Sequence, residues 1–401
     1  MRKTQTRERK RHKNASVVRP FATLTDGIFG NIYQAITGNV HIPAHFVRRA
    51  IANGLPAAEL QDAIRSAKTV RALPDYLLAA SEQKLERALY WDELGLKARA
   101  RDLYLDSTLW GLYAEQLIDD EDKRQLVWRK YRESYRRAAP YFAHPAEEVS
   151  IHYLASTVSG YFRAPVQQEA DAEYFSSRTP VVILLNGLFS AREEFHFLEN
   201  SLLSQGFATL SVDYPGTVSH SAQVPTSFDV KELANSLYMH LSARPDVDCS
   251  RITLYGQSLG GRLALQMALA FPERFQSIVS MSTPLDLLSN LDRLVPVFGR
   301  EHMVSPLAAR ASLYEFGLHT QIEQNIQHIE APLLVLGGGK DKVVHADQTR
   351  QIYDRSFSAD KKLILCPGAG HCLYEMMPSI RYEIAQWIKQ RTASSSPLAA
   401  D

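Results

Sequence analysis

Cysteine is scarce in this sequence, neither sign of charge is in excess, and long apolar runs are missing. The 401 residues include three cysteines, 45 lysines and arginines, and 44 aspartates and glutamates. So few cysteines form no disulfide framework, which favours a reducing, cytoplasmic setting. Balanced charge provides no general attraction to nucleic acid or to an anionic membrane. Because no eighteen uncharged apolar residues follow one another, we expect no transmembrane helix.

Patterns that hold metals or phosphates are also missing. Cys366 and Cys372 flank His371, but no second pair of cysteines or histidines stands at ligand spacing, so we predict no metal site. The glycines at 337–339 are not followed by the Lys-Ser or Lys-Thr pair of a phosphate-binding loop. We therefore expect a protein that works without a cofactor.

The start of the chain is basic and nearly free of apolar residues. It reads MRKTQTRERKRHKN, which predicts a disordered tail over residues 1–18. Contact of this tail with nucleic acid or anionic lipid is the alternative to a solvated arm. The apolar segment of a secretory signal does not follow it. Residues 396–401 are expected to form a second flexible tail.

Residues 19–145 show the periodicity of helices and almost no strand signal, and prolines divide them into several segments. We predict an all-helical cap domain with Arg129, Lys130 and Arg132 on its outer faces. Apolar residues recur at helical spacing in two stretches: Leu85, Leu89 and Leu94, then Leu126, Tyr131 and Tyr135. Five aromatic residues are candidates for a ligand pocket, with core packing as the alternative: Trp91, Tyr104, Trp110, Tyr113 and Trp128.

Residues 146–395 change to short apolar runs that alternate with helical stretches. This alternation predicts an α/β domain with a mainly parallel sheet covered on both faces, and the first two runs predict an antiparallel hairpin. A longer excursion at 284–331 is interpreted as a lid or as helices that cover the sheet, with Phe298, Tyr314 and Phe316 as pocket candidates. The strand-like runs are VSIHYLAS, VSGYFRAP, PVVILLNG, FATLSVDYPG, RITLYGQS, FQSIVSMS, APLLVLGGG and KKLILCPG.

One serine stands at the break between a strand and a helix. The sequence RITLYGQSLGGRLALQMALAFPERF is strand-like up to Tyr255 and helix-like after Gly260. Glycines two residues before and two after Ser258 suit a strained turn, because side chains there would collide with the neighbouring strand and helix. The spacing predicts a nucleophile elbow with Ser258 as nucleophile, and a glycine-rich turn with an incidental serine is the alternative.

A serine hydroxyl needs a base to take its proton, and the base needs a carboxylate to orient it. Asp341 follows APLLVLGGGK and His371 follows KKLILCPGAG, so both stand on glycine-rich turns just after predicted strands. We predict that Ser258, His371 and Asp341 form a catalytic triad. Asp286, which follows the predicted strand FQSIVSMS, is the alternative acid.

Attack on a carbonyl group creates an oxyanion, which must meet backbone N–H donors. Leu259, directly after the serine, is expected to provide one. The loop after PVVILLN is expected to provide the second from Gly187 or Leu188, with Phe189 as the alternative. Asp213 ends another predicted strand, and we expect it to fix the turn that follows.

Together these residues resemble the α/β hydrolase superfamily, in which serine, aspartate and histidine follow in this order. The closer resemblance is to the branch of the fermentation-respiration switch protein and the fungal yellowish-green pigment hydrolases. It rests on the helical cap, the hairpin, the first-loop stretch NGLFSAREEF and the elbow, over residues 88–391. This branch includes esterases and hydrolases that cleave a carbon-carbon bond beside a ketone, in polyketide shortening and in nicotine breakdown. The chain has Asn186-Gly187 where the branch commonly has two glycines.

The resemblance implies a serine hydrolase that acts through an acyl-enzyme on an ester or on a ketone of the β-diketone or aromatic type. An acyltransferase, or a lactone-forming or thioesterase-like enzyme, on the same triad is the first alternative. A ligand-binding protein that keeps the fold without turnover is the second. The expected partners are a small molecule between cap and core and a second copy of the chain in a homodimer, but neither nucleic acid nor a membrane.

Overall fold

The computed structural model describes most of the chain between residues 42 and 393. The described residues are 42, 44–69, 71–118, 120–166, 178–188, 190–214, 228–287 and 322–393. Outside them lie the predicted tails 1–18 and 396–401, most of the excursion 284–331, and the candidates Phe189, Phe298, Tyr314 and Phe316. Within these segments no helix combines the length and the apolar character needed to cross a membrane.

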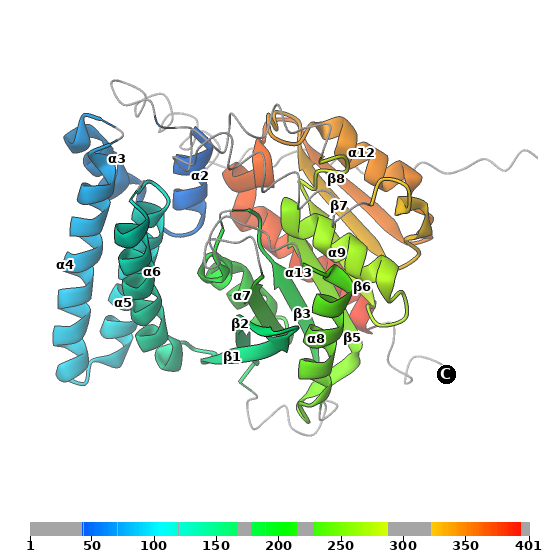
Figure 1. Ribbon diagram of the computed structural model, residues 1–401, viewed down its shortest axis with the longest axis horizontal. Coiled ribbons are helices and arrows are strands. Elements are labelled where there is room, and N and C mark those ends of the chain that lie inside the picture. The colour runs from blue at the N-terminus through cyan, green and yellow to red at the C-terminus, as the bar shows by residue number, and fades with distance from the viewer. Residues whose placement is uncertain are drawn as a thin grey trace, which may run out of the picture.

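Residues 44–141, here called the helical region, contain no strand among their described residues. In Figure 1, α4, α5 and α6 stand side by side, and α2 lies between them and the sheet. The helices are α2 (Ala44–Ala52), α3 (Ala57–Ala67), α4 (Leu73–Glu93), α5 (Lys97–Glu115) and α6 (Glu121–Ala138), followed by the 3-10 turn η1 (Ala139–Tyr141). The predicted helical character of this part of the chain is confirmed.

Local sequence explains how two of these helices begin and pack. The Asp120 side chain accepts a hydrogen bond from the backbone N–H of Lys123 at 2.7 Å, which caps the start of α6. A Cβ atom at Gly111 of α5 would lie 2.8 Å from the Cβ of Tyr131. Glycine therefore lets α5 and α6 approach closely.

One expectation about the faces of these helices is wrong. Arg132 is only 6% exposed, whereas Arg129 and Lys130 are exposed as predicted. Among the periodic apolar residues, Leu89, Leu94 and Leu126 are exposed, whereas Tyr131 and Tyr135 are buried. The charge of Arg132 lies inside because it pairs with carboxylates of the sheet domain, a contact that helical periodicity does not predict.

Every predicted apolar run forms a strand of one sheet, whose order is β1-β2-β4-β3-β5-β6-β7-β8. The strands are β1 (Ala146–Tyr153), β2 (Ser156–Arg163), β3 (Thr179–Leu185), β4 (Ala208–Asp213), β5 (Val247–Gln257), β6 (Ser277–Met281), β7 (Leu333–Gly338) and β8 (Lys361–Cys366). The β1–β2 and β2–β4 pairs are antiparallel, and all later pairs are parallel. The predicted α/β class with an antiparallel start is confirmed.

Helices cover both faces of the sheet. One apolar core joins it to α8 (Val230–Ser242), α9 (Leu259–Ala270) and α12 (Ala346–Arg355). The other core joins it to α7 (His196–Leu203) and α13 (Met377–Ala393). Because β3 to β8 are parallel, their carboxyl ends lie along one edge, where the loops after them meet.

Candidate active site

Ser258 stands in the sharp turn from β5 to α9, with a φ of 53°. Non-glycine residues rarely adopt a positive φ, so the turn is held by its surroundings. A Cβ atom at Gly256 would lie 2.3 Å from the carbonyl oxygen of Gly260, and one at Gly260 would lie 2.1 Å from that of Leu185. Packing therefore requires both glycines of the motif.

His371 lies between Ser258 and Asp341. Its Nε2 is 3.0 Å from the serine Oγ, and its Nδ1 is 2.8 Å from Oδ2 of the aspartate. The other carboxylate oxygen of Asp341 accepts hydrogen bonds from the backbone N–H groups of Val343 and Val344, each at 2.8 Å. The carboxylate is thus held in place while it orients the imidazole.

The glycines at 337–339 permit close packing around this pair. A Cβ atom at Gly338, at the end of β7, would lie 2.3 Å from the carbonyl oxygen of Gly370. The strand end therefore packs directly against the loop that carries His371. The rival acid, Asp286, donates its backbone N–H to the Gln348 side chain, while the histidine Nδ1 pairs with Asp341.

The electrostatic surroundings favour the charged form of His371. Burial acts to lower its pKa, but the charge of Asp341 and the hydrogen bond to it hold the pKa well above the ordinary histidine value. An imidazole in this setting is a stronger base than a free one. It can therefore accept a proton from Ser258 and hold it as an ion pair with the aspartate.

The two leucines predicted to form the oxyanion hole are Leu259, which follows Ser258 in the chain, and Leu188. Leu259 is the first residue of α9, where the N–H has no acceptor within the helix. Leu188 follows Gly187, whose Cβ position would lie 3.2 Å from the Cβ of Ser258. Among the described residues, neither N–H of these leucines donates a hydrogen bond to the protein. Their role as oxyanion donors stays a prediction.

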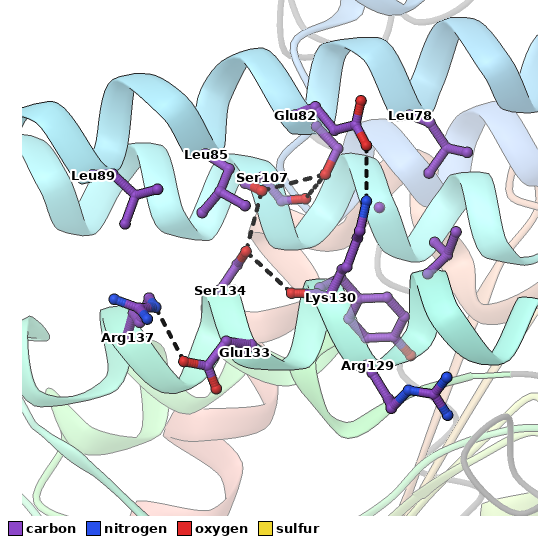
Figure 2. Close-up of a pocket in the computed structure, with 14 residues that line it drawn as sticks. Leu78, Glu82, Leu85, Leu89, Ser107, Arg129, Lys130, Glu133, Ser134 and Arg137 are labelled. Carbon is purple, nitrogen blue, oxygen red and sulfur yellow. Dashed lines mark hydrogen bonds and ion pairs between the residues drawn. The ribbon is translucent and has the colours of Figure 1, made fainter. Parts of the chain in front are cut away.

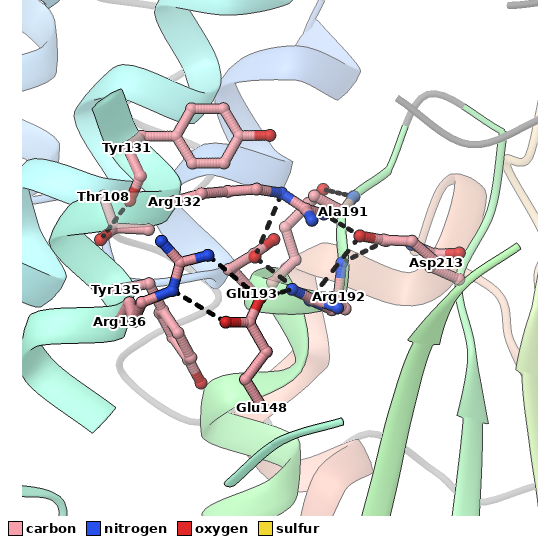
Figure 3. Close-up of polar contacts among 12 residues, drawn as sticks. Thr108, Tyr131, Arg132, Tyr135, Arg136, Glu148, Ala191, Arg192, Glu193 and Asp213 are labelled. Carbon is pink, nitrogen blue, oxygen red and sulfur yellow. Dashed lines mark hydrogen bonds and ion pairs between the residues drawn. The ribbon is translucent and has the colours of Figure 1, made fainter. Parts of the chain in front are cut away.

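The loop after β3 is held by the buried carboxylate of Asp213. Its Oδ1 accepts from the backbone N–H of Arg192 at 3.0 Å and from Nδ2 of Asn186 at 3.1 Å. Its Oδ2 forms an ion pair with Arg132 of α6 (Figure 3). The contacts of Asp213 thus include the loop after β3 and the helical region. The turn that Asp213 was expected to fix lies largely outside the described residues.

Arg132 also contacts a second carboxylate, that of Glu193. Its Nε is 3.6 Å from Oε1 of Glu193, in the 3-10 turn η3 (Arg192–Phe195). Burial opposes the charge, but Glu193 and Asp213 together raise the pKa of Arg132 above its ordinary value. The helical region is therefore joined to the loop after β3 by a buried ion-pair network.

A second buried cluster joins α2 to the same loop. The Nε and Nη2 atoms of Arg49 both donate to the carboxylate of Glu194, at 2.7 and 2.5 Å. Arg49 also donates to Oγ of Ser190 at 3.0 Å, and Asn53 and Tyr113 donate to Glu194 at 2.8 and 3.1 Å. Burial opposes the charge of Arg49, yet Glu194 holds the pKa of Arg49 well above the ordinary arginine value.

The helix α2 also touches the loop of His371. The ring of His45 lies 5.4 Å from the His371 ring and 5.3 Å from the Tyr374 ring, measured between centroids. Arg48 forms an ion pair of 2.6 Å with Glu375, which also accepts from the backbone N–H of Gly370. These residues could not be predicted from the sequence, because nothing in a helical pattern shows which turn will face a distant loop.

The five aromatic pocket candidates belong to the packing of the helical region. Tyr104, Trp110 and Tyr113 are buried in its apolar clusters, and Trp91 and Trp128 pack against them. The Tyr113 hydroxyl also contacts the loop after β3, through Glu194. Core packing is therefore the role that the structure supports for most of them.

A separate cleft of about 360 Å³ lies within the helical region, between α4 and α6 (Figure 2). Leu78, Leu85 and Val127 contribute apolar surface. Ion pairs from Lys130 to Glu82 and from Arg137 to Glu133 lie at its polar rim. Neither the predicted triad nor any of the five aromatic candidates lines it.

Comparison with known families agrees with the observed sheet. A family model described as the alpha/beta hydrolase fold matches residues 180–303, and one described as serine aminopeptidase S33 matches residues 302–375. This chain has the α/β hydrolase fold. The first match includes the turn of Ser258, and the second includes Asp341 and His371.

This chain has curated relatives that are consistent with the branch that its sequence resembles. It is 26% identical to the 2,6-dihydropseudooxynicotine hydrolase of Paenarthrobacter nicotinovorans over 85% of this chain and 90% of that protein. It is 22% identical to the esterase FrsA of Photobacterium profundum over 79% of this chain and 75% of that protein. The expectation of an enzyme of the hydrolase class is confirmed.

Solved structures support the fold over most of the chain. A crystal structure of 2,6-dihydroxy-pseudo-oxynicotine hydrolase covers 88% of this chain and 98% of that chain, with a TM-score of 0.73 and 22% identity. The structure of wild-type AbyA5 covers 80% of this chain and 84% of that chain, with a TM-score of 0.59 and 17% identity. The helical region is thus included in the similarity to the first structure.

Proposed function

We propose that this chain is a serine hydrolase that cleaves an ester, or a carbon-carbon bond beside a ketone, through an acyl-enzyme. The observation that carries the proposal is the hydrogen-bonded line from Asp341 through His371 to Ser258, at 2.8 and 3.0 Å. A serine is activated in this way when an oriented imidazole accepts its proton.

In the first step, Oγ of Ser258 attacks the substrate carbonyl carbon while its proton passes to Nε2 of His371. The carbonyl oxygen becomes an oxyanion and accepts hydrogen bonds from the backbone N–H groups of Leu259 and Leu188. Asp341 balances the charge of the resulting imidazolium. The two N–H groups and the triad thereby stabilise charge where it develops.

In the second step, the tetrahedral intermediate collapses and the bond to the leaving group breaks. The leaving group takes the proton from His371, whether it departs as an alkoxide from an ester or as an enolate from a diketone. The acyl group stays on Ser258. Water then gives a proton to the same imidazole and attacks the acyl carbon. The imidazolium returns this proton to Oγ of Ser258 as the bond to the acyl group breaks, which releases the acid and restores the serine.

The substrate class rests on similarity. Two of the relatives are named as an esterase and as a hydrolase of a pseudooxynicotine, and the resembled branch includes enzymes that cleave beside ketones. The helical region, which we propose as a cap over residues 19–145, would cover the substrate from the side of α2. A small acyl or ketone compound is thus the proposed substrate.

Labelling with a fluorophosphonate tests the proposal, because this probe reacts only with an activated serine. We expect labelling of the wild-type chain and its loss in Ser258→Ala and His371→Ala. Ser250→Ala, which removes an exposed hydroxyl bound to Asp248, should label normally. Turnover of an aryl ester and of a β-diketone then distinguishes the two bond types. A folded wild-type chain that neither labels nor turns over either compound would overturn the proposal.

A further inference from the structure

The loop of His371 crosses two strands before it reaches Ser258. His371 follows β8 and Ser258 follows β5, and β6 and β7 lie between these strands in the sheet. Neighbouring strands are about 4.8 Å apart, so three spacings separate the two starting points by about 14 Å. A contact of 3.0 Å between the side chains therefore depends on what supports the loop along its path.

The end of β6 contacts both partners. The carbonyl oxygen of Met281 accepts a hydrogen bond from the backbone N–H of Ser258 at 2.8 Å. The next residue, Ser282, accepts one at its Oγ from the backbone N–H of Cys372 at 3.0 Å. Cys372 directly follows His371. Two adjacent residues thus connect the serine turn with the histidine loop.

Ser282 is itself fixed in the sheet. It is fully buried, and its backbone N–H donates to the carbonyl oxygen of Leu336 in β7 at 2.8 Å. Its φ is 48°, and the φ values of Cys372 and Leu373 are 57° and 52°. A non-glycine residue in a sparsely populated conformation of this kind persists only where its surroundings hold it.

We propose that Ser282 is a positioning residue that sets the distance between His371 and Ser258, an inference that rests on the proposed function. Its hydroxyl holds the strained backbone at Cys372, and Met281 holds the backbone of Ser258 from the same strand end. Without the hydroxyl, the loop relaxes and the imidazole moves relative to the serine. Misplacement by about 1 Å can cost about 100-fold in rate.

Ser282→Gly is the decisive variant, because glycine tolerates a positive φ and loses only the hydroxymethyl group. Ser282→Ala is the second variant. Ser280→Ala is the matched control: Ser280 lies on the same strand end, is equally buried, and its hydroxyl pairs with Thr283 at 2.7 Å instead of the histidine loop. Each variant is examined for its melting temperature, for its rate of fluorophosphonate labelling against pH, and for kcat and KM with an aryl ester.

We expect Ser282→Gly to stay folded at the assay temperature but to label about 10-fold to 100-fold more slowly, with a lower kcat, an unchanged KM and a shifted pH profile. Ser282→Ala should show the same kinetic losses, whereas Ser280→Ala should keep the wild-type rate. Equal labelling rates in wild type and Ser282→Gly would overturn the inference and leave the proposed function intact. An equal loss in Ser280→Ala would also overturn it. A wild type that does not label would overturn both.

Discussion

The hydroxyl oxygen of Ser258 lies 3.0 Å from Nε2 of His371, although 113 positions separate the two residues in the chain. Their loops meet because β5 and β8 are parallel and end at the same edge of the sheet. The same edge carries Asp341, after β7, and Asp213, at the end of β4. Catalytic rate and its pH dependence should therefore follow from the contacts at this edge.

Asp341 and Asp286 should differ sharply in their effect on rate. Because Asp341 orients the imidazole through a 2.8 Å hydrogen bond, Asp341→Asn should lower kcat for an aryl ester by about 10⁴-fold. Asp286→Asn should change kcat little. Both variants should keep the wild-type circular dichroism spectrum. The opposite order of effects would identify Asp286 as the acid.

The reaction of Ser258 should depend on the pKa of His371. Burial lowers this pKa, but Asp341 outweighs burial and raises it well above the ordinary histidine value. Only the neutral imidazole accepts the serine proton, so the labelling rate should rise with pH through that raised pKa, at a pH above about 6.5. In Asp341→Asn the raising charge is gone, and the midpoint should move to lower pH. Labelling rates measured across pH would contradict this if the midpoint stayed in place.

Glu115 should make the fold less stable as pH rises. Burial raises the pKa of this carboxyl to about 8, although Arg124 lies near it. The folded chain therefore holds a proton that the unfolded chain loses at its ordinary pKa of about 4.5. The contribution of protonated Glu115 to the free energy of unfolding is complete below about pH 4.5 and is lost as pH rises through about 8.

Glu115→Gln tests this dependence because it removes the titrating group and keeps the shape of the side chain. At about pH 9 the variant should unfold at a higher denaturant concentration than the wild type, and the difference should shrink toward about pH 5. Glu93→Gln replaces an exposed acid of the same helical region and should follow the wild-type curve. Parallel curves for wild type and Glu115→Gln would refute the prediction.

The buried pair of Arg132 and Asp213 should matter for stability far more than a neighbouring surface pair. Arg132→Met leaves the buried carboxylates of Asp213 and Glu193 without this partner, which should cost about 3–5 kcal/mol in the free energy of unfolding. Lys130→Met breaks an exposed pair with Glu82 and should cost at most about 1 kcal/mol. Urea unfolding measures the free energy of unfolding of both variants. Equal losses in Arg132→Met and Lys130→Met would contradict the prediction that the buried pair matters more.

Short sequence patterns predicted the strands of the sheet and the turn at Ser258 well. Each predicted apolar run forms a strand, since buried parallel strands read as continuous apolar segments. The glycines around Ser258 were informative because the contacts that exclude a Cβ atom there come from the adjoining strand and helix. Asp341 and His371 could be proposed because each follows a strand directly, so one parallel sheet brings their loops to a common edge.

The faces of the helices were less predictable. Arg132 looks like a surface residue in a charged helix, and its burial depends on Asp213, 81 positions later. His45 and Arg49 lie in a helix whose own sequence does not reveal that it packs against the loops of His371 and Ser190. Ser282 is one serine among many until its hydroxyl is seen at Cys372.

The sequence by itself determined the division into helices and strands, the α/β class, and the residue types that suit a nucleophile, a base and an acid. These features depend on short-range physics: periodic burial, glycine at crowded turns, and loops that directly follow strands. Only the tertiary structure decided that Asp341 orients His371, that Arg132 and Arg49 anchor the helical region to the loop after β3, and that Ser282 supports the histidine loop. Those pairings join residues far apart in the chain, and their partners are chosen by how the helices and strands pack, which no local pattern encodes.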